Sequence, residues 1–448
     1  MKRSLYFMTT AAGLGIAALA AIGWAEGQTS ALPQHRSPAV TALSILTAQI
    51  PDGADAEKLR HGQDLMRAGD CVSCHMRKGG EPLSGGLGLK TPFGIIYSSN
   101  ITPDLETGIG RWTPDQFYRA MHDGHGVNGE NLYPAFPYPW FRNMSRADDD
   151  ALLAYIKTTA PVRYTPPANE LIFPLSYRSL VTGWNLLFLK NEQDAPVSEK
   201  SKAWNRGAYL VNGPGHCGAC HTPKNAFGAD RAGQEFKGAV VDNWTAPDLT
   251  GNVRTGLGAW SEADIAEYLK TGRNAHAGAG GAMADVVTYS TSLLTDADRA
   301  AIAVYLKNLP GSSSKSTTVL VDAASLSRGR EIYSDACASC HLESGKGQPG
   351  LFPPLGRNAM VQQLDATGLE QLILAGTSIA ATPSRPSPLS MPAFSWKLSD
   401  QEIADVATFV RNSWGNRASA IDPGDVAALR KQLKLQEPRR TDNSGDQD

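Results

Sequence analysis

The sequence predicts an all-α protein of three consecutive domains, each of about 100 residues. Three observations predict this fold class. A Cys-x-x-Cys-His motif occurs three times, at 71–75, 217–221 and 337–341. A segment with apolar residues three or four positions apart precedes each motif, as in an amphipathic helix. A second helix, which opens with a hydroxyl residue followed three positions later by an acid, closes each repeat.

The first element of each repeat is the helix that leads into the motif. These helices are expected at 57–66, 205–210 and 327–333. The closing helices are expected to begin at Ser145, Thr295 and Ser399, each followed three residues later by Asp148, Asp298 or Glu402. The hydroxyl caps an early backbone N–H, and the acid interacts favourably with the positive end of the helix.

The first two repeats share a further element. Trp112 begins a helical pattern that runs to Gly124, and Trp260 begins another that runs to Gly272 after the same interval. The related runs 107–110 and 255–258 precede them. The chain therefore divides into segments with the following expected bounds: signal 1–25, linker 26–54, first domain 55–160, connector 161–200, second domain 201–310, linker 311–322, third domain 323–415 and polar C-terminal tail 416–448.

The N-terminus has the pattern of an export signal. Lys2 and Arg3 precede an apolar run from Leu5 to Gly23, and small residues follow at the expected cleavage position. The alternative is that the run is retained as a single membrane anchor, because its length is near the upper limit for a signal. Either outcome predicts an exported protein on the periplasmic face of the inner membrane.

All six cysteines lie in the three motifs. A disulfide framework would scatter cysteines, a redox Cys-x-x-Cys needs no histidine after it, and the remaining histidines do not complete a zinc site. Two thiols three residues apart on a helical turn can form thioethers with the two vinyl groups of a haem, and the adjacent histidine then binds the iron. The sequence therefore predicts three covalent haem c groups, with thioethers at Cys71, Cys74, Cys217, Cys220, Cys337 and Cys340 and iron ligands at His75, His221 and His341.

The sixth iron ligand is expected between each motif and the closing helix. Met391 lies eight residues before Ser399, and Met283 lies twelve residues before Thr295. A thioether ligand stabilises reduced haem iron and raises its potential. Although a loop methionine more often fills a gap in a core, we predict that Met283 and Met391 are ligands.

The first repeat lacks a methionine in register with Met391, because Phe136 holds that place. We predict Met144, directly before Ser145, as the ligand. Met121 is expected to face the core of its own helix, and Met76 is too close to the motif to cross the ring. The alternatives are a five-coordinate iron and an unrecognised ligand, with His122 and His125 expected to be solvated surface residues.

Several runs resemble one known family: 100–104, 107–110, 132–135, 173–175, 184–188 and 206–223. The chain is similar over about residues 55 to 415 to the three-haem cytochrome c subunits of bacterial membrane-associated dehydrogenases, which oxidise alcohols, aldehydes, gluconate, sorbitol or fructose. The resemblance implies three tandem cytochrome c domains and the haem residues given above. It also implies a large dehydrogenase subunit with flavin, pyrroloquinoline quinone or molybdopterin, a possible small subunit, and ubiquinone or another electron acceptor.

The resemblance further implies association with the membrane surface, for which a short amphipathic helix at 422–435 is a candidate. The apolar runs 171–175 and 184–188 in the connector are expected either to pack between the first two domains or to dock a dehydrogenase subunit.

The composition limits the remaining functions. The net charge is −2, with 42 basic and 44 acidic residues, which gives no reason to expect a nucleic-acid partner. No acid–base pair or Gly-rich cofactor turn is recognisable, so we expect an electron-transfer subunit without substrate chemistry of its own. The alternatives are a stand-alone electron shuttle and a haem enzyme with an open iron in the first domain.

Overall fold

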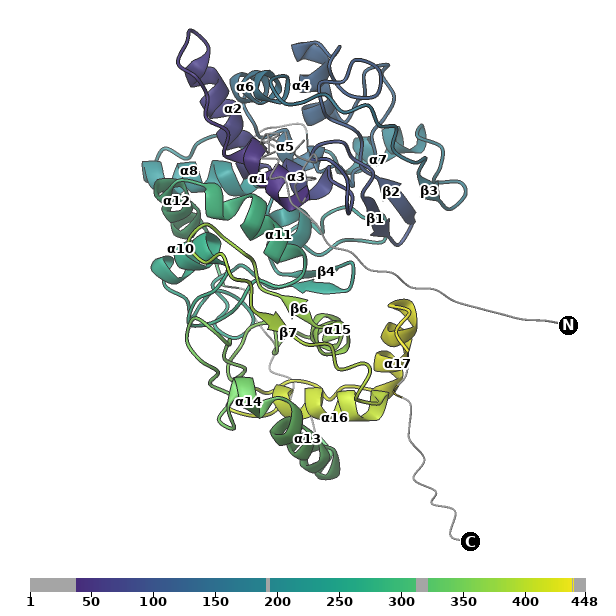
Figure 1. The fold of residues 1–448 in the computed structure, drawn as a ribbon, viewed down its shortest axis with the longest axis vertical. Helices are drawn as coiled ribbons and strands as arrows, with labels where there is room; N and C mark the ends of the chain where they lie inside the picture. The colour runs from purple at the N-terminus through teal and green to yellow at the C-terminus, as the bar shows by residue number, and fades with distance from the viewer. Residues whose placement is uncertain (1–37, 191–193, 312–320, 437, 439–448) are drawn as a thin grey trace, which may run out of the picture. The chain divides into compact units, whose positions relative to one another are not determined.

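Each of the three repeats is built on a pair of packed helices, one before the haem motif and one at the end of the repeat (Figure 1). The computed structural model describes residues 38–190, 194–311, 321–436 and 438, so the predicted signal at 1–25 lies outside the described residues. The pairs are α2 (Ala56–Ala68) with α6 (Arg146–Ile156), α8 (Lys202–Asn212) with α12 (Asp296–Lys307), and α13 (Ala323–Ala336) with α16 (Asp400–Arg411).

A glycine sits at the contact point of each pair. A Cβ added to Gly62 would lie 2.1 Å from the carbonyl oxygen of Ala151 on the closing helix. The corresponding distances are 2.0 Å from Gly207 to Ala301 and 2.2 Å from Gly329 to Asp405. The three glycines therefore allow the helices to approach more closely than any other residue type would permit.

The predicted caps of the closing helices are confirmed. Ser145, Thr295 and Ser399 are the N-cap residues of α6, α12 and α16, and each hydroxyl accepts the backbone N–H three residues later. The patterns that start at Trp112 and Trp260 form α4 (Pro114–Asp123) and α10 (Glu262–Thr271). Both helices end at the expected glycines, Gly124 and Gly272, in the left-handed conformation.

Shorter helices surround these pairs. The motifs form single turns at α3 (Cys71–Cys74), α9 (Gly218–His221) and α14 (Ala338–His341). The remaining elements of the three repeats are α5 (Tyr138–Phe141), α11 (Ala282–Tyr289), η1 (Thr291–Leu293) and α15 (Thr367–Ala375).

The all-α prediction is wrong in detail, because short antiparallel strands accompany the helices. β1 (Gly88–Thr91), β2 (Gly94–Tyr97) and β3 (Glu170–Leu171) form one sheet, in which Gly88 pairs with Tyr97. Two further pairs are β4 (Ala239–Val241) with β5 (Trp244–Ala246) and β6 (Thr377–Ser378) with β7 (Ser390–Met391). These strands are two to four residues long, too short to show a recognisable alternation in the sequence.

Helices also lie outside the three predicted domains. The predicted linker 26–54 contains α1 (Pro38–Leu46), whose Ala42 and Leu46 are fully buried in the first core. The predicted polar tail 416–448 contains α17 (Pro423–Gln432), which packs on α15 and α16 through Val426 and Leu429. The sequence suggested that this helix attaches to the membrane surface. Its apolar face is buried instead, so α17 does not offer that face to a membrane.

The connector has structure of its own. β3 joins the sheet of the first domain, and α7 (Leu180–Phe188) follows it. None of the helices in the described part of the chain is long and apolar enough to cross a bilayer.

Candidate haem sites

The histidines of the three motifs have the same hydrogen-bonded arrangement. Nδ1 of His75 donates to the carbonyl oxygen of Ser99 at 2.7 Å, and Nδ1 of His221 donates to that of Pro247 at 2.7 Å. Nδ1 of His341 lies 3.1 Å from the carbonyl oxygen of Pro353. A proton fixed on Nδ1 leaves the lone pair of Nε2 for a metal and orients the ring. Each histidine therefore has an oriented ring whose Nε2 is available to a metal.

A glycine after each motif fixes the histidine backbone. The N–H groups of Gly85, Gly238 and Gly347 donate to the carbonyl oxygens of His75, His221 and His341 at 2.7, 2.9 and 3.0 Å, in that order. These glycines have φ values of 75°, 84° and 59°, a region of backbone conformation that residues other than glycine disfavour. The sequence analysis missed this shared feature, because the glycines stand 10, 17 and 6 residues after their histidines.

None of the six cysteines is paired with another in a disulfide. Burial raises the pKa of the Cys71 and Cys217 thiols to about 12, and that of Cys337 to about 11. A redox-active Cys-x-x-Cys pair instead has a lowered thiol pKa, because the thiolate is the nucleophile. The described residues contain no cluster of three or more His, Cys, Asp or Glu side chains that could hold a bare metal ion. The raised pKa values thus show no thiolate activation of the kind that thiol–disulfide exchange uses.

One cavity of about 490 Å³ reaches from the second motif to the third. His221 and Met283 line it in the second domain, and His341 and Met391 line it in the third. Most of the lining is aliphatic or aromatic, including Leu210, Leu257, Leu369, Ile373, Val406 and Val410. An apolar cavity with attachment thiols, an oriented imidazole and a thioether fits a haem, whose two faces are apolar and whose iron takes nitrogen and sulfur ligands.

The structure adds a residue that sequence reasoning overlooked in the third domain. Met360 also follows the third motif and lines the same cavity as Met391. Met391 lies in β7, opposite Thr377 of β6, which gives its backbone a fixed position. Met360 lies in a loop, where Asn358 accepts its backbone N–H at 3.0 Å. The third domain therefore has two methionines that could face the haem.

The predicted ligand of the first domain is buried. Met144 is 1 % exposed and belongs to the first core, together with Met121 and Phe141. Phe136 packs against the same core. The side chain of Met144 is thus held in an apolar environment.

His122 is not the solvated surface residue that the sequence suggested. It is 3 % exposed, and its Nε2 lies 2.7 Å from Oδ2 of Asp149. Burial raises the pKa of the Asp149 carboxyl group, and the His122 hydrogen bond opposes that rise. Sequence reasoning missed this pair, because its two residues lie on different helices, α4 and α6.

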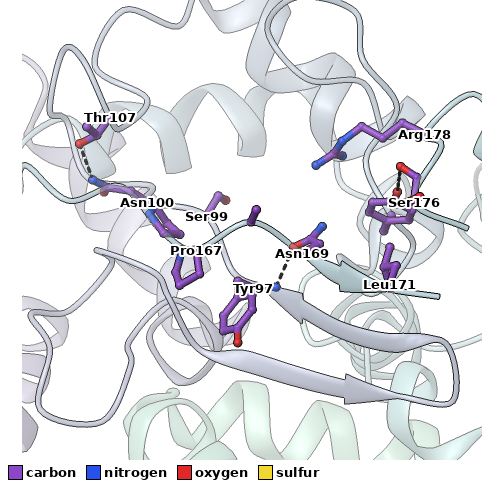
Figure 2. A pocket seen from close by; sticks show the side chains of 12 residues that line it. Tyr97, Ser99, Asn100, Thr107, Pro167, Asn169, Leu171, Ser176 and Arg178 are labelled. Atoms are coloured by element: carbon purple, nitrogen blue, oxygen red, sulfur yellow. Dashed lines mark hydrogen bonds between the residues drawn. The ribbon is translucent and has the colours of Figure 1, made fainter. Parts of the chain in front are cut away.

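A second cavity, of about 440 Å³, lies beside the first motif (Figure 2). Its lining includes Ser99, the hydrogen-bond partner of His75, and Tyr133 of the loop that carries Phe136. Asn169 and Arg178 of the connector contribute to the polar part of the lining. Figure 2 shows the strand that carries Tyr97 crossing beneath these side chains, where the Tyr97 N–H donates to Asn169 at 2.9 Å. The connector thus forms part of the surroundings of the first site.

The first and second sites are in direct contact. A Cβ on Gly218, inside the second motif, would lie 2.0 Å from the ring of Trp140 in the first domain. The rings of Phe141 and His216 are 4.9 Å apart. Helix α11, which carries Met283, packs against α3 of the first motif. The three candidate sites therefore form a connected series, with the second linked to both the others.

Comparison with known proteins supports this arrangement. The cytochrome c family matches the chain three times, at residues 59–160, 205–310 and 326–414. The chain is 40 % identical to a gluconate 2-dehydrogenase cytochrome c subunit of Pantoea cypripedii, over 86 % of this chain and 92 % of the relative. It is 41 % identical to the cytochrome c subunit of an alcohol dehydrogenase (quinone) of Gluconobacter oxydans strain 621H, over 87 % and 85 %. A fructose dehydrogenase cytochrome subunit of Gluconobacter japonicus is 34 % identical, over 87 % and 86 %.

Proposed function

The chain belongs to the cytochrome c family, among the cytochrome subunits of bacterial dehydrogenases, and on that premise we propose that it carries electrons from a dehydrogenase subunit to a respiratory acceptor. The three matches correspond to three covalently bound haem c groups. Haem iron supplies reversible one-electron chemistry, and the residues of this chain hold and tune it.

The proposed ligand sets are His75 with Met144, His221 with Met283, and His341 with Met391. The hydrogen bonds of the three imidazoles to backbone carbonyls support the histidine assignments. The cavity lining supports Met283 and Met391, and burial supports Met144. A six-coordinate iron leaves no position for a substrate, so these sets favour electron transfer over substrate chemistry.

The single observation that carries the proposal is the continuity of the sites. The second and third motifs line one cavity, and the first motif packs on the helix that bears Met283. A chain with one isolated haem site would need no such contacts. A series of adjoining sites in one polypeptide suits the passage of electrons between two external partners.

The partners are proposed by analogy with the relatives. The electron donor is a large dehydrogenase subunit with flavin, pyrroloquinoline quinone or molybdopterin, and a small subunit can accompany it. The acceptor is ubiquinone or another respiratory carrier. The complex is proposed to lie at the periplasmic face of the inner membrane, where the exported chain would meet both partners.

Isolation of the haem-loaded chain from its native membranes tests the proposal. A dehydrogenase subunit should co-purify and be identified from its peptides. Addition of its substrate, with gluconate, ethanol and fructose as the first trials, should reduce the haems, and a ubiquinone analogue should reoxidise them. A monomeric chain whose haems no dehydrogenase reduces would refute the proposal. A high-spin absorbance band that shifts with cyanide would instead indicate an open iron and a haem enzyme.

A further inference from the structure

The connector presents an unusually apolar surface. Six of the sixteen large hydrophobic side chains that are exposed among the described residues come from residues 172–187. Together with one residue of the second domain they form what we call the connector surface: Ile172, Phe173, Tyr177, Leu180, Leu186, Leu187 and Phe227. Leu186 is 87 % exposed, Phe173 81 % and Leu187 73 %, so the surface is open to solvent rather than partly covered.

The connector surface is held in place by the domains beneath it. The indole N–H of Trp184 donates to the carbonyl oxygen of Phe227 at 3.0 Å, and the rings of Phe188 and Phe227 are 5.9 Å apart. The first domain adds a second anchor, because the hydroxyl of Tyr138 donates to Oδ1 of Asn185 at 2.5 Å. Helix α7 is therefore anchored by one side, and its leucines at 186 and 187 project from the other.

The charges of this segment have one sign. Between Leu171 and Lys190 the only charged residues are Arg178 and Lys190. The guanidinium of Arg178 donates to the carbonyl oxygen of Asn131 and lies over the ring of Tyr133, so Lys190, which is exposed just after α7, is the basic group left to meet a lipid. Helix α7 itself has no charged residue among its nine. Exposed leucine and phenylalanine side chains can enter the interface of a bilayer, and nearby basic groups are attracted to anionic lipid headgroups. Aromatic rings are also enriched at that depth.

We propose that the connector surface docks on a bilayer that contains anionic phospholipid. Phe173, Leu186 and Leu187 enter the boundary between headgroups and acyl chains, and Lys190 contacts lipid phosphates. This inference rests on the proposed function only in that both place the chain at a membrane. It assigns the attachment to the connector rather than to α17, whose apolar face is buried.

The test uses the full chain with its haems attached and vesicles of phosphatidylethanolamine and phosphatidylglycerol. The triple variant Phe173→Ser, Leu186→Ser, Leu187→Ser should partition onto these vesicles at least about tenfold more weakly than the wild type. The matched control is Leu364→Ser with Trp396→Ser, which removes side chains that are 83 % and 72 % exposed elsewhere. The control should bind like the wild type.

Two further measurements locate the contact. A photoactivatable phospholipid should label peptides from 172–188, and binding to neutral phosphatidylcholine vesicles should be weaker and independent of salt. Unchanged partitioning of the triple variant, or labelling confined to residues 1–37, would overturn the proposal. Retained vesicle binding with loss of the co-purifying dehydrogenase subunit would also overturn it, because the surface would then be a protein interface.

The controls for folding and function are separate readouts. Far-UV circular dichroism and reduced-minus-oxidised haem absorbance should be unchanged in every variant, and the single variant Leu187→Ser gives a milder perturbation of the same surface. Loss of haem reduction by the dehydrogenase with intact vesicle binding would count against the proposed function alone. A wild-type chain that does not bind vesicles, but whose haems the dehydrogenase still reduces, would count against the proposed membrane docking alone.

Discussion

Each repeat has a glycine at the contact between its leading and closing helices. Replacement of Gly207 by alanine tests this contact in the second repeat. The added Cβ would lie 2.0 Å from the carbonyl oxygen of Ala301 and 2.8 Å from Cβ of Tyr305. Both contacts involve the backbone, or the atom next to it, on α12, so no side-chain rotation can relieve them. The helices α8 and α12 must therefore separate, and the attachment cysteines that follow α8 would move with it.

The magnitude follows from two opposing effects. Overpacking of a well-packed core costs up to about 3 kcal/mol, and replacement of a helical glycine by alanine returns about 1 kcal/mol. The net loss is about 2 kcal/mol. For a repeat of about 100 residues that unfolds cooperatively, that loss lowers Tm by about 8 to 16 °C. Thermal unfolding of the haem-loaded protein, followed by far-UV circular dichroism, measures the change.

The chain provides a matched control in Gly183, which also lies inside a helix. A Cβ at Gly183 would meet nothing within 4 Å. Gly183→Ala should therefore leave Tm unchanged or raise it slightly, because alanine has the higher helix propensity. A Gly207→Ala protein as stable as the wild type, or a Gly183→Ala protein equally destabilised, would show that the close helix contact is not what stabilises the repeat.

Three further predictions concern the haems and one buried acid. The double variant Cys217→Ala, Cys220→Ala should lose one of three haems, visible as one haem less in intact mass and about a third less reduced-minus-oxidised absorbance; an unchanged mass would refute attachment there. Met391→Leu should lower the midpoint potential of one haem in a redox titration, because loss of a thioether ligand destabilises the reduced iron. Met360→Leu should leave the potentials of all three haems unchanged. The reverse result would make Met360 the ligand. Burial raises the pKa of Glu370 to about 7, so the folded state retains a proton that the unfolded state releases at lower pH. Stability should then fall as the pH rises from about 4.5 to about 7, and Glu370→Gln should flatten that part of the Tm profile; an identical profile would contradict the assignment.

The sequence predicted those parts of the fold that depend on neighbouring residues. The motif spacing is a property of one helical turn, and the caps at Ser145, Thr295 and Ser399 involve a side chain and a backbone three residues away. Such contacts can be recognised from a few positions. The closing glycines of α4 and α10 were predicted for the same reason.

Features that depend on distant partners escaped the sequence analysis. Gly207 looks like a weak point in a helix until Ala301, on a helix 94 positions away in the chain, is placed against it. The burial of His122 depends on Asp149, which a later helix contributes. Likewise, the face of α17 at Val426 and Leu429 has the pattern of a surface helix, and only its contact with α15 and α16 shows that it is core.

The repeated helix contact explains how one local motif yields three equivalent sites. In each repeat the glycine at the contact fixes the leading helix against the closing helix, and the motif begins within ten residues of that glycine. The histidine is then held by two backbone contacts, one at Nδ1 and one at its own carbonyl oxygen. Under the proposed ligand sets, we expect differences between the sites to arise on the opposite side of the ring, from Met144, Met283 and Met391 and their surroundings. Helix α11 has a special position among these surroundings, because it bears Met283 and also packs against the first motif. A change in α11 should consequently affect the potentials of the first and second haems together in a redox titration, and the hydrogen bond from the Gly281 N–H to Thr377, the partner of Met391, couples the third site to the same helix.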